Sequence, residues 1–341
     1  MVSPESFAQN YEREQRPLNE EEIRAGWGNY TAEYGVPEAL VIEPTSRCDM
    51  GTCPACYMNS ECGRGDDMTP ETFANVLACI KESLPEGEKL GQVWIPGGEP
   101  TLVDNLPEII NASKDVAGEV CLVTNGLNLA NYEYARDLIE RSDLDEIAIT
   151  LSSGNADLDN LLRAADDDPI WRQVPEGDVD AVLAEGRGIT SGAECDFHER
   201  VMQGIVNVSQ IKKELDKDFR VAINLNMHHG ADLDELLRAV EDRGGHIDLV
   251  LFQAFQPAGR GVVGTSRSFE WQAHTEEMWR EYIRQAEEAI RDGRLGAAVF
   301  VDPAPREIEE ALDLENCPFY EKAVETPAFD QYGRVRANVV S

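Results

Sequence analysis

The sequence ALVIEPTSRCDMGTCPACY, residues 39–57, joins a short apolar stretch to a segment rich in cysteine. Aliphatic and β-branched residues predominate in 39–43, which predicts a β-strand. Cys48, Cys53 and Cys56 follow on the loop that begins where this strand ends. Thiolates on one short loop can hold a single inorganic cluster, because soft sulfur ligands suit iron–sulfur centres and zinc. The stretch therefore predicts a metal site at a strand end.

Strands and helices alternate along the chain beyond this loop. The predicted strands are 39–43, 91–95, 119–124, 146–151, 219–225, 247–252 and 296–301. Amphipathic helices are predicted between them, at about 70–84, 106–116, 132–140, 199–215, 233–243 and 275–291. This alternation indicates an α/β protein with a parallel sheet, as an open barrel or as a doubly wound sheet. In both architectures ligands bind at the carboxyl ends of the strands.

The pattern divides the chain into three parts. Residues 1–37 are expected to form an N-terminal extension of short helices and loops. Residues 38–262 form the predicted core, with a long insertion at about 153–197. Residues 263–341 are expected to add a helix, a strand and an irregular tail. A connection as long as the insertion is usually functional or mobile.

Polar residues follow several of the predicted strands. The second strand is followed by PGGEPTL, residues 96–102, in which two glycines allow a ligand to approach the backbone closely. The carboxylate of Glu99 could hold an ammonium group. Polar side chains also stand at the next strand ends, namely Asn125, Ser152 and Asn224. Together these positions predict a ring of hydrogen-bonding groups around one ligand.

On these motifs, residues 39–262 resemble the radical S-adenosylmethionine (SAM) superfamily. The resemblance implies a partial (β/α)6 parallel barrel with an N-terminal helical extension and a C-terminal cap. It also implies a [4Fe–4S] cluster on Cys48, Cys53 and Cys56, with SAM bound to the open iron. The family usually has three residues between the first two cysteines, whereas this chain has four, and Gly51 could absorb the extra residue as a bulge.

The resemblance also implies contacts to SAM. Tyr57 would lie near the adenine, and the segment Gly97, Gly98 and Glu99 would bind the methionine amino group. Asn125 is expected among the cofactor-binding residues, and Ser152 and Asn224 among the contacts to ribose and carboxylate.

The implied reaction is reductive cleavage of SAM to methionine and a 5′-deoxyadenosyl radical. The radical would act on a cofactor, lipid or peptide, and the enzyme would be an oxidoreductase or a transferase. An external donor such as ferredoxin or flavodoxin would supply the electron. The alternative is a non-catalytic zinc or iron–sulfur protein on a related barrel, with Cys62 as a fourth zinc ligand.

The remaining cysteines and the histidines offer little support for a second metal site. Cys79 and Cys121 are expected to be small buried hydrophobic residues. Cys62, Cys195 and Cys317 stand far apart in the sequence, so one cluster is predicted. The tail 316–335 faintly resembles the start of an auxiliary-cluster extension but lacks its later cysteines. His198 is expected at a helix start, and His228 and His229 in an exposed turn.

The charge of the chain is strongly negative. Sixty-five acidic residues face thirty basic ones, a net charge of −35, and the basic residues comprise 7 Lys and 23 Arg. The electrostatic field of a chain with this net charge would repel nucleic acid and anionic membranes. Acids spread along the whole chain favour a halophilic protein, in which salt screens the self-repulsion. No run of eighteen apolar residues and no secretory signal is found, so a cytoplasmic protein without a membrane span is expected.

Overall fold

The computed structural model describes residues 16–50, 53, 56, 58, 60, 65–163, 197–228, 232–253, 275–300, 306–312, 314, 317–318 and 326–336. Its strands form one nine-stranded sheet in the order β7-β6-β5-β4-β3-β2-β1-β8-β9. The strands are β1 (Ala39–Ile42), β2 (Leu90–Ile95), β3 (Ala117–Thr124), β4 (Glu146–Thr150), β5 (Arg220–Asn226), β6 (Leu249–Gln253), β7 (Ala297–Phe300), β8 (Ala328–Phe329) and β9 (Val335–Arg336). Neighbours from β7 to β8 pair in parallel, and only the β8–β9 pair is antiparallel.

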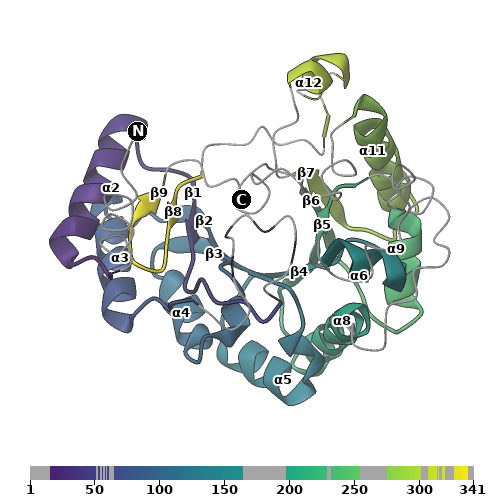
Figure 1. Ribbon diagram of the computed structural model, residues 1–341, viewed down its shortest axis with the longest axis horizontal. Coiled ribbons are helices and arrows are strands. Elements are labelled where there is room, and N and C mark those ends of the chain that lie inside the picture. The colour runs from purple at the N-terminus through teal and green to yellow at the C-terminus, as the bar shows by residue number, and fades with distance from the viewer. Residues whose placement is uncertain are drawn as a thin grey trace, which may run out of the picture.

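Helices cover the convex face of this sheet, which curves into an open partial barrel (Figure 1). They are α2 (Glu20–Tyr34), α3 (Pro70–Ser83), α4 (Leu106–Ser113), α5 (Tyr132–Arg141), α8 (Phe197–Glu214), α9 (Leu233–Glu241) and α11 (Glu276–Arg291). Two further helices, α6 (Ala156–Arg163) and α12 (Arg306–Leu312), pack on α8 and α11 respectively. The predicted parallel α/β partial barrel is confirmed. It carries β7 on one edge and the β8–β9 hairpin on the other.

Alternating side chains explain why the strands pack in this way. Residues such as Leu40, Val93 and Ile147 point outward under the helices and are fully buried. On the inner face, Ala148 and Ala222 pack beside the half-buried Trp94. The outer face of the central strands is thus continuously apolar, as a face covered by helices requires. The inner face is mixed, because Arg220 bonds to Glu119 and Glu146 beside these small apolar residues.

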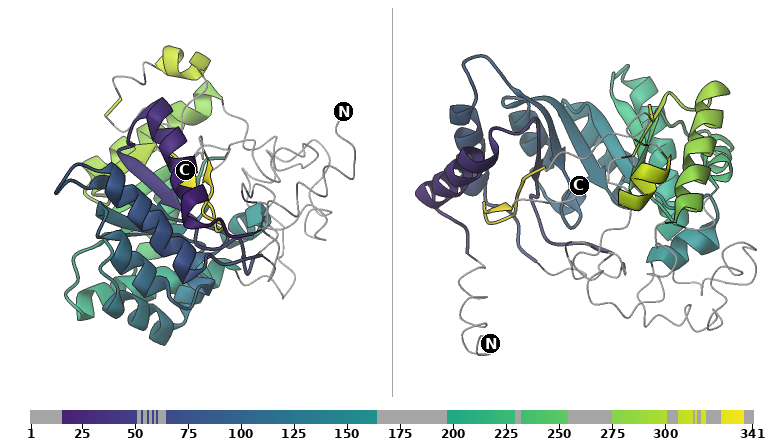
Figure 2. Two further views of the ribbon diagram at one scale, coloured as in Figure 1. Left: turned by 90° about the vertical axis from the view of Figure 1, so that its left-hand side faces the viewer. Right: turned by 90° about the horizontal axis from the view of Figure 1, so that it is seen from above.

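Two parts of the chain differ from the prediction. Within the described residues of the N-terminal extension, 20–34 form one continuous helix, α2, which begins at a capping box formed by Asn19 and Glu22. Its buried side chains, among them Trp27, lie beside Phe329 of β8. Figure 2 shows α2 and the hairpin together at the β1 edge of the sheet. The C-terminal tail is therefore not irregular throughout, because its residues 328–336 extend the sheet.

The predicted insertion at 153–197 begins with a helix. α6 occupies Ala156–Arg163, directly after β4, and residues 164–196 lie outside the described part of the chain. Among the described residues, no helix has the length and apolar character needed to cross a bilayer.

Candidate functional site

The cysteine loop leaves β1 and returns to α3 through a hydrogen-bonded neck. Thr45 and Asp67 form an isolated antiparallel bridge, and the Thr45 hydroxyl donates to Asp67 Oδ1 at 2.6 Å. The Ser46 N–H donates to the carbonyl of Asp66 at 3.0 Å. The two ends of the loop therefore meet at the carboxyl end of β1.

The three predicted cluster ligands lie on this loop. Cys48 is buried, and Cys53 and Cys56 are partly buried. The Cys56 N–H donates to the Cys53 carbonyl at 3.2 Å, which makes a tight turn between these two residues. Tyr57, the predicted adenine contact, lies outside the described residues, as does Cys62.

Arg47, next to Cys48, ties the loop to the segment after β2. Its guanidinium makes two hydrogen bonds to Asp67, at 2.8 and 2.6 Å, and a third to the Leu102 carbonyl at 3.0 Å. A bidentate guanidinium–carboxylate pair fixes both distance and orientation. The neck of the loop is thus held against the end of the 96–102 segment.

The two glycines after β2 pack directly against the start of the cysteine loop. Gly98 N–H donates to the Thr45 carbonyl at 2.8 Å, and Glu99 N–H donates to the Arg47 carbonyl at 2.6 Å. A Cβ atom on Gly98 would overlap the Arg47 carbonyl, and Gly97 has a φ of +142°. Glycine is therefore required here by contact between two chain segments, a constraint that the sequence did not reveal.

The Glu99 side chain is turned into the protein. Its Oε1 accepts hydrogen bonds from the Thr101 N–H, the Thr101 hydroxyl and the Thr124 hydroxyl, at 3.1, 2.6 and 2.6 Å. Its Oε2 accepts one from the Asn125 N–H at 2.7 Å. Burial raises the pKa of Glu99 to about 7, although these hydrogen bonds lower it. The carboxylate joins the exits of β2 and β3 and is fully buried, so a ligand would meet the main chain of this segment.

Asn125, at the exit of β3, faces the cysteine loop. Its Nδ2 donates to Asp49 Oδ1 at 2.7 Å and lies 4.0 Å from Cys48 Sγ. Its Oδ1 accepts from the Leu127 N–H at 2.9 Å, which fixes the orientation of the amide. The structure thus brings Asn125 together with the predicted ligand Cys48.

Ser152 follows β4, and Asn224 lies near the carboxyl end of the neighbouring parallel strand β5. Ser152 is buried, its N–H donates to Asp159 Oδ1 at 2.9 Å, and its carbonyl faces His228 Nε2 at 2.8 Å. Asn224 is partly buried and its Nδ2 donates to Gln253 Oε1 at 3.0 Å. Both share the carboxyl edge of the sheet with the cysteines, and their roles toward SAM stay predictions.

His228 is not an exposed turn residue, contrary to the sequence-based expectation. It is 1% exposed, and its N–H and carbonyl both bond to the hydroxyl of Tyr282 on α11, each at 3.0 Å. This burial could not be predicted from the sequence, because Tyr282 lies 54 residues away along the chain. His229 lies outside the described residues.

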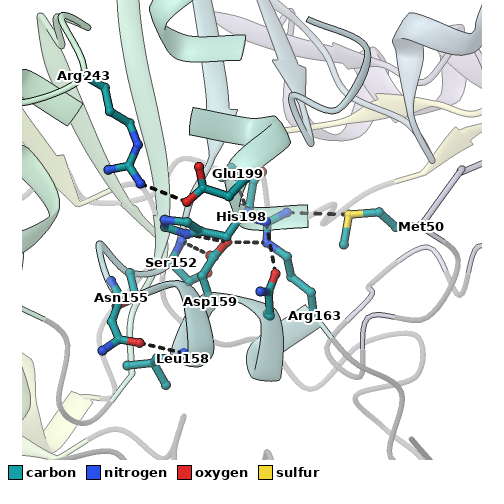
Figure 3. A network of polar contacts seen from close by, with 12 residues as sticks. Met50, Ser152, Asn155, Leu158, Asp159, Arg163, His198, Glu199 and Arg243 are labelled. Atoms are coloured by element: carbon teal, nitrogen blue, oxygen red, sulfur yellow. Dashed lines mark hydrogen bonds and ion pairs between the residues drawn. The ribbon is translucent and has the colours of Figure 1, made fainter. Parts of the chain in front are cut away.

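A buried charged network at the exit of β4 was also missed from the sequence (Figure 3). Asp159 and Arg163 of α6 pair at 3.0 Å, and His198 Nδ1 at the start of α8 lies 3.5 Å from Asp159 Oδ2. Burial raises the pKa of Asp159, but Arg163 and His198 outweigh it and hold this pKa below its ordinary value. The i,i+4 spacing of Asp159 and Arg163 was the available signal. His198 lies in the first turn of α8, and its place at a helix start agrees with the prediction.

The remaining described cysteines do not gather into a second site. Cys79 and Cys121 are buried in the core, as predicted, and burial raises the pKa of both thiols. Cys317 is partly buried and packs against the main core. Cys195 lies outside the described residues.

The donor set at the β1 exit fits an iron–sulfur cluster in chemical type. Three thiols stand on one loop, and an amide donor lies beside Cys48 Sγ, as the outer partners of metal ligands do. Within the described ranges, no three His, Cys, Asp or Glu side chains already converge as the ligands of one metal ion would. The ligand set therefore rests on donor type and spacing, and it stays a prediction.

Comparison with protein families identifies one matching model. Residues 42–174 match the model of the radical SAM superfamily. Among curated proteins, a segment of 101 residues is 31% identical to the 7,8-dihydro-6-hydroxymethylpterin dimethyltransferase of Methanocaldococcus jannaschii, covering 29% of this chain and 19% of that protein. A segment of 124 residues is 31% identical to the PqqA peptide cyclase of Streptomyces rochei, covering 36% and 31%. The matches thus span less than a third of each relative.

Solved structures share the fold at lower sequence identity. SuiB of Streptococcus suis, solved bound to S-adenosylmethionine, superposes with a TM-score of 0.54 at 13% identity, covering 89% of this chain and 61% of that one. SuiB bound to its precursor peptide SuiA superposes with a TM-score of 0.52 at 14% identity, covering 84% and 54%. This likeness shows the partial-barrel fold.

Proposed function

Because residues 42–174 match the model of the radical SAM superfamily, we propose that the chain is a radical SAM enzyme whose Cys48, Cys53 and Cys56 hold one [4Fe–4S] cluster. These three thiolates would hold the cluster, which when bound and reduced would supply the electron for cleavage of SAM to methionine and a 5′-deoxyadenosyl radical. The observation that carries the proposal is the position of all three thiols on the loop after β1, beside the glycine segment after β2. Carboxyl ends of parallel strands are where barrels of this type bind ligands.

The chain's own residues bind, orient and shield in this scheme. The main chain of Gly97 and Gly98 would contact the amino acid part of SAM, while Glu99 fixes that segment against the exit of β3. The amide of Asn125 would donate to the Cys48 thiolate. Ser152 and Asn224 would contact the ribose and carboxylate, and Tyr57 the adenine. Burial of Cys48 and Met50 would limit access of water and oxygen to this side of the site.

The electron would come from an external one-electron donor such as a ferredoxin or flavodoxin. The substrate would be a cofactor, a lipid or a peptide. The names of the matched relatives, one for a pterin and one for a peptide, support the first and the last of these classes. The net charge of −35 disfavours nucleic acid as a substrate.

Anaerobic SAM cleavage tests the proposal. Protein reconstituted with iron and sulfide and reduced with dithionite should release 5′-deoxyadenosine, and Cys53→Ala should abolish the release. Cys79→Ala is the matched control, because Cys79 is buried in α3 away from the loop and should leave cleavage unchanged. Cleavage at the wild-type rate by Cys53→Ala would refute the ligand assignment. Wild-type protein that binds zinc but, when supplied with iron and sulfide, assembles no cluster and cleaves no SAM would favour the non-catalytic zinc alternative.

A further inference from the structure

The first half of the cysteine loop carries a buried methionine. Met50 stands two residues after Cys48 and is 3% exposed. Arg163, the last residue of α6, is also buried, and its Nη1 donates to Met50 Sδ at 3.6 Å. Figure 3 shows the guanidinium of Arg163 directed toward the Met50 sulfur. A segment that follows β4 thus touches the loop that follows β1.

The guanidinium of Arg163 is fixed by two further contacts. Nε donates to Asp159 Oδ2 at 3.0 Å, and Nη2 donates to the carbonyl of Thr150, the last residue of β4, at 2.5 Å. Asp159 is itself held, because its other oxygen accepts the Ser152 N–H. A buried cation is costly unless it is paired and hydrogen-bonded, and this pairing satisfies that requirement.

The contact to Met50 is not needed to compensate the buried charge. A thioether sulfur is a weak acceptor, whereas Asp159 and Thr150 supply a carboxylate and a carbonyl. The contact instead gives the loop a fixed point on a rigid element of the sheet. Such a point matters most where the loop is long, and four residues separate Cys48 from Cys53.

We propose that Arg163 positions the cysteine loop through Met50 and so holds Cys48 in place to retain the cluster. This inference rests on the proposed function. Arg163 is a positioning residue, because its described contacts are with protein groups. Outer groups that orient metal ligands typically change metal affinity by about 10–100-fold when they are replaced.

Two conservative substitutions separate this role from general stability. Met50→Leu keeps the volume and the apolar character but removes the sulfur acceptor. Arg163→Lys keeps a charge for Asp159 but lacks the planar fork that reaches three partners. Met278→Leu on α11 is the matched control, since Met278 is also buried and lies outside the network.

The measurement is the rate at which reconstituted protein loses iron to a ferrous chelator under anaerobic conditions. Arg163→Lys should lose iron about tenfold faster than wild type, Met50→Leu faster by a smaller factor, and Met278→Leu at the wild-type rate. The double variant should lose iron no faster than Arg163→Lys alone, because both changes remove the same contact.

Two results would overturn the inference while leaving the proposed function intact. One is wild-type rates of iron loss in both single variants. The other is a double variant whose rate is the product of the two single effects, which would mean that the residues act independently. Wild-type protein that takes up no iron and sulfide would overturn the proposed function, and this inference with it.

Discussion

The carboxyl group of Glu99 is a buried acid whose environment was not visible in the sequence. Its place after two glycines suggested a ligand for an ammonium group, whereas the structure shows four hydrogen bonds from Thr101, Thr124 and Asn125. Sequence position fixed the backbone location but not the direction of the side chain. That direction depends on the short 310 turn Pro100–Leu102, which Glu99 caps.

Glu99→Gln should change how stability depends on pH. The pKa of Glu99 rises to about 7 in the folded protein, mainly through burial, so the folded state binds more protons than the unfolded state between the two pKa values. The stability that wild type gains from the neutral acid is therefore present at low pH and is lost as pH rises toward 7. The difference in unfolding free energy, wild type minus Glu99→Gln, should fall by about 2 kcal/mol between pH 5.5 and 8.5.

Urea denaturation of the two apo-proteins between pH 5.5 and 8.5, at constant salt, measures the difference between their unfolding free energies. Taking the difference cancels the other titrating groups, which both proteins share. A difference that stays constant or grows with pH would contradict a raised pKa for Glu99.

The Asp159, Arg163 and His198 network marks the limit of prediction at this scale. The three cysteines could be found because they are close in sequence and chemically distinctive. The network joins α6 to α8 across residues 164–196, and its members are common residue types. Only the folded chain brings them together.

At the scale of elements, the contact between the 96–102 segment and the cysteine loop is the tightest constraint on the site. Gly98→Ala should destabilise the fold by about 1–3 kcal/mol, because the added Cβ overlaps the Arg47 carbonyl and two backbones must separate. The same displacement should lower the iron content after reconstitution, since Arg47 precedes Cys48. A substitution that blocked SAM alone would leave iron content normal.

Gly28→Ala provides the control for this variant. Gly28 lies within α2 with no atom within 4 Å of an added Cβ, so alanine should leave stability unchanged or raise it by up to about 1 kcal/mol. Denaturation curves and iron content of both variants are compared with wild type. Full stability with full iron content in Gly98→Ala would show that the two segments do not pack as described.

Strand β8 shows why order in the C-terminal tail cannot be predicted from the sequence. It has only two residues, too few for any period in the sequence, and it forms because the edge of β1 offers unpaired backbone groups. The longer elements were predicted to within a few residues, since each combines a periodic apolar face with end signals such as Thr69 and Pro70 of α3.

Phe329→Ala tests whether this hairpin is part of the core. Phe329 of β8 is fully buried and its ring lies 5.4 Å from that of Trp27, so its loss should cost about 3–5 kcal/mol of unfolding free energy. Val36→Ala, at a residue 43% exposed, should cost no more than about 0.5 kcal/mol. Chemical denaturation measures both, and equal effects of the two changes would argue against a packed hairpin.

For the whole molecule, charge is the property that sets the solution conditions. The net charge of −35 makes the folded chain repel itself, while most of the described ion pairs, such as Arg284 with Glu288, are exposed and individually weak. Salt screens both the repulsion among the acidic residues and the attraction within the ion pairs. The repulsion contributes more to the free energy of unfolding than these ion pairs do.

The melting temperature of the apo-protein should therefore rise with potassium chloride. The Debye length falls from about 10 Å at 0.1 M to about 3 Å at 1 M, so repulsion between distant acids is largely removed. Calorimetry or circular dichroism between dilute buffer and molar salt gives the trend. A melting temperature that is flat or falls over this range would refute the halophilic interpretation.

The account as a whole depends on one cluster held by one set of thiols, and iron and acid-labile sulfide per chain measure this most directly. Protein reconstituted anaerobically should contain about four of each, the composition of a single [4Fe–4S] cluster. The variant with Cys48, Cys53 and Cys56 all replaced by alanine should contain neither. About eight irons in wild type, or about four persisting in the triple variant, would mean that other cysteines hold a cluster and would contradict the assignment.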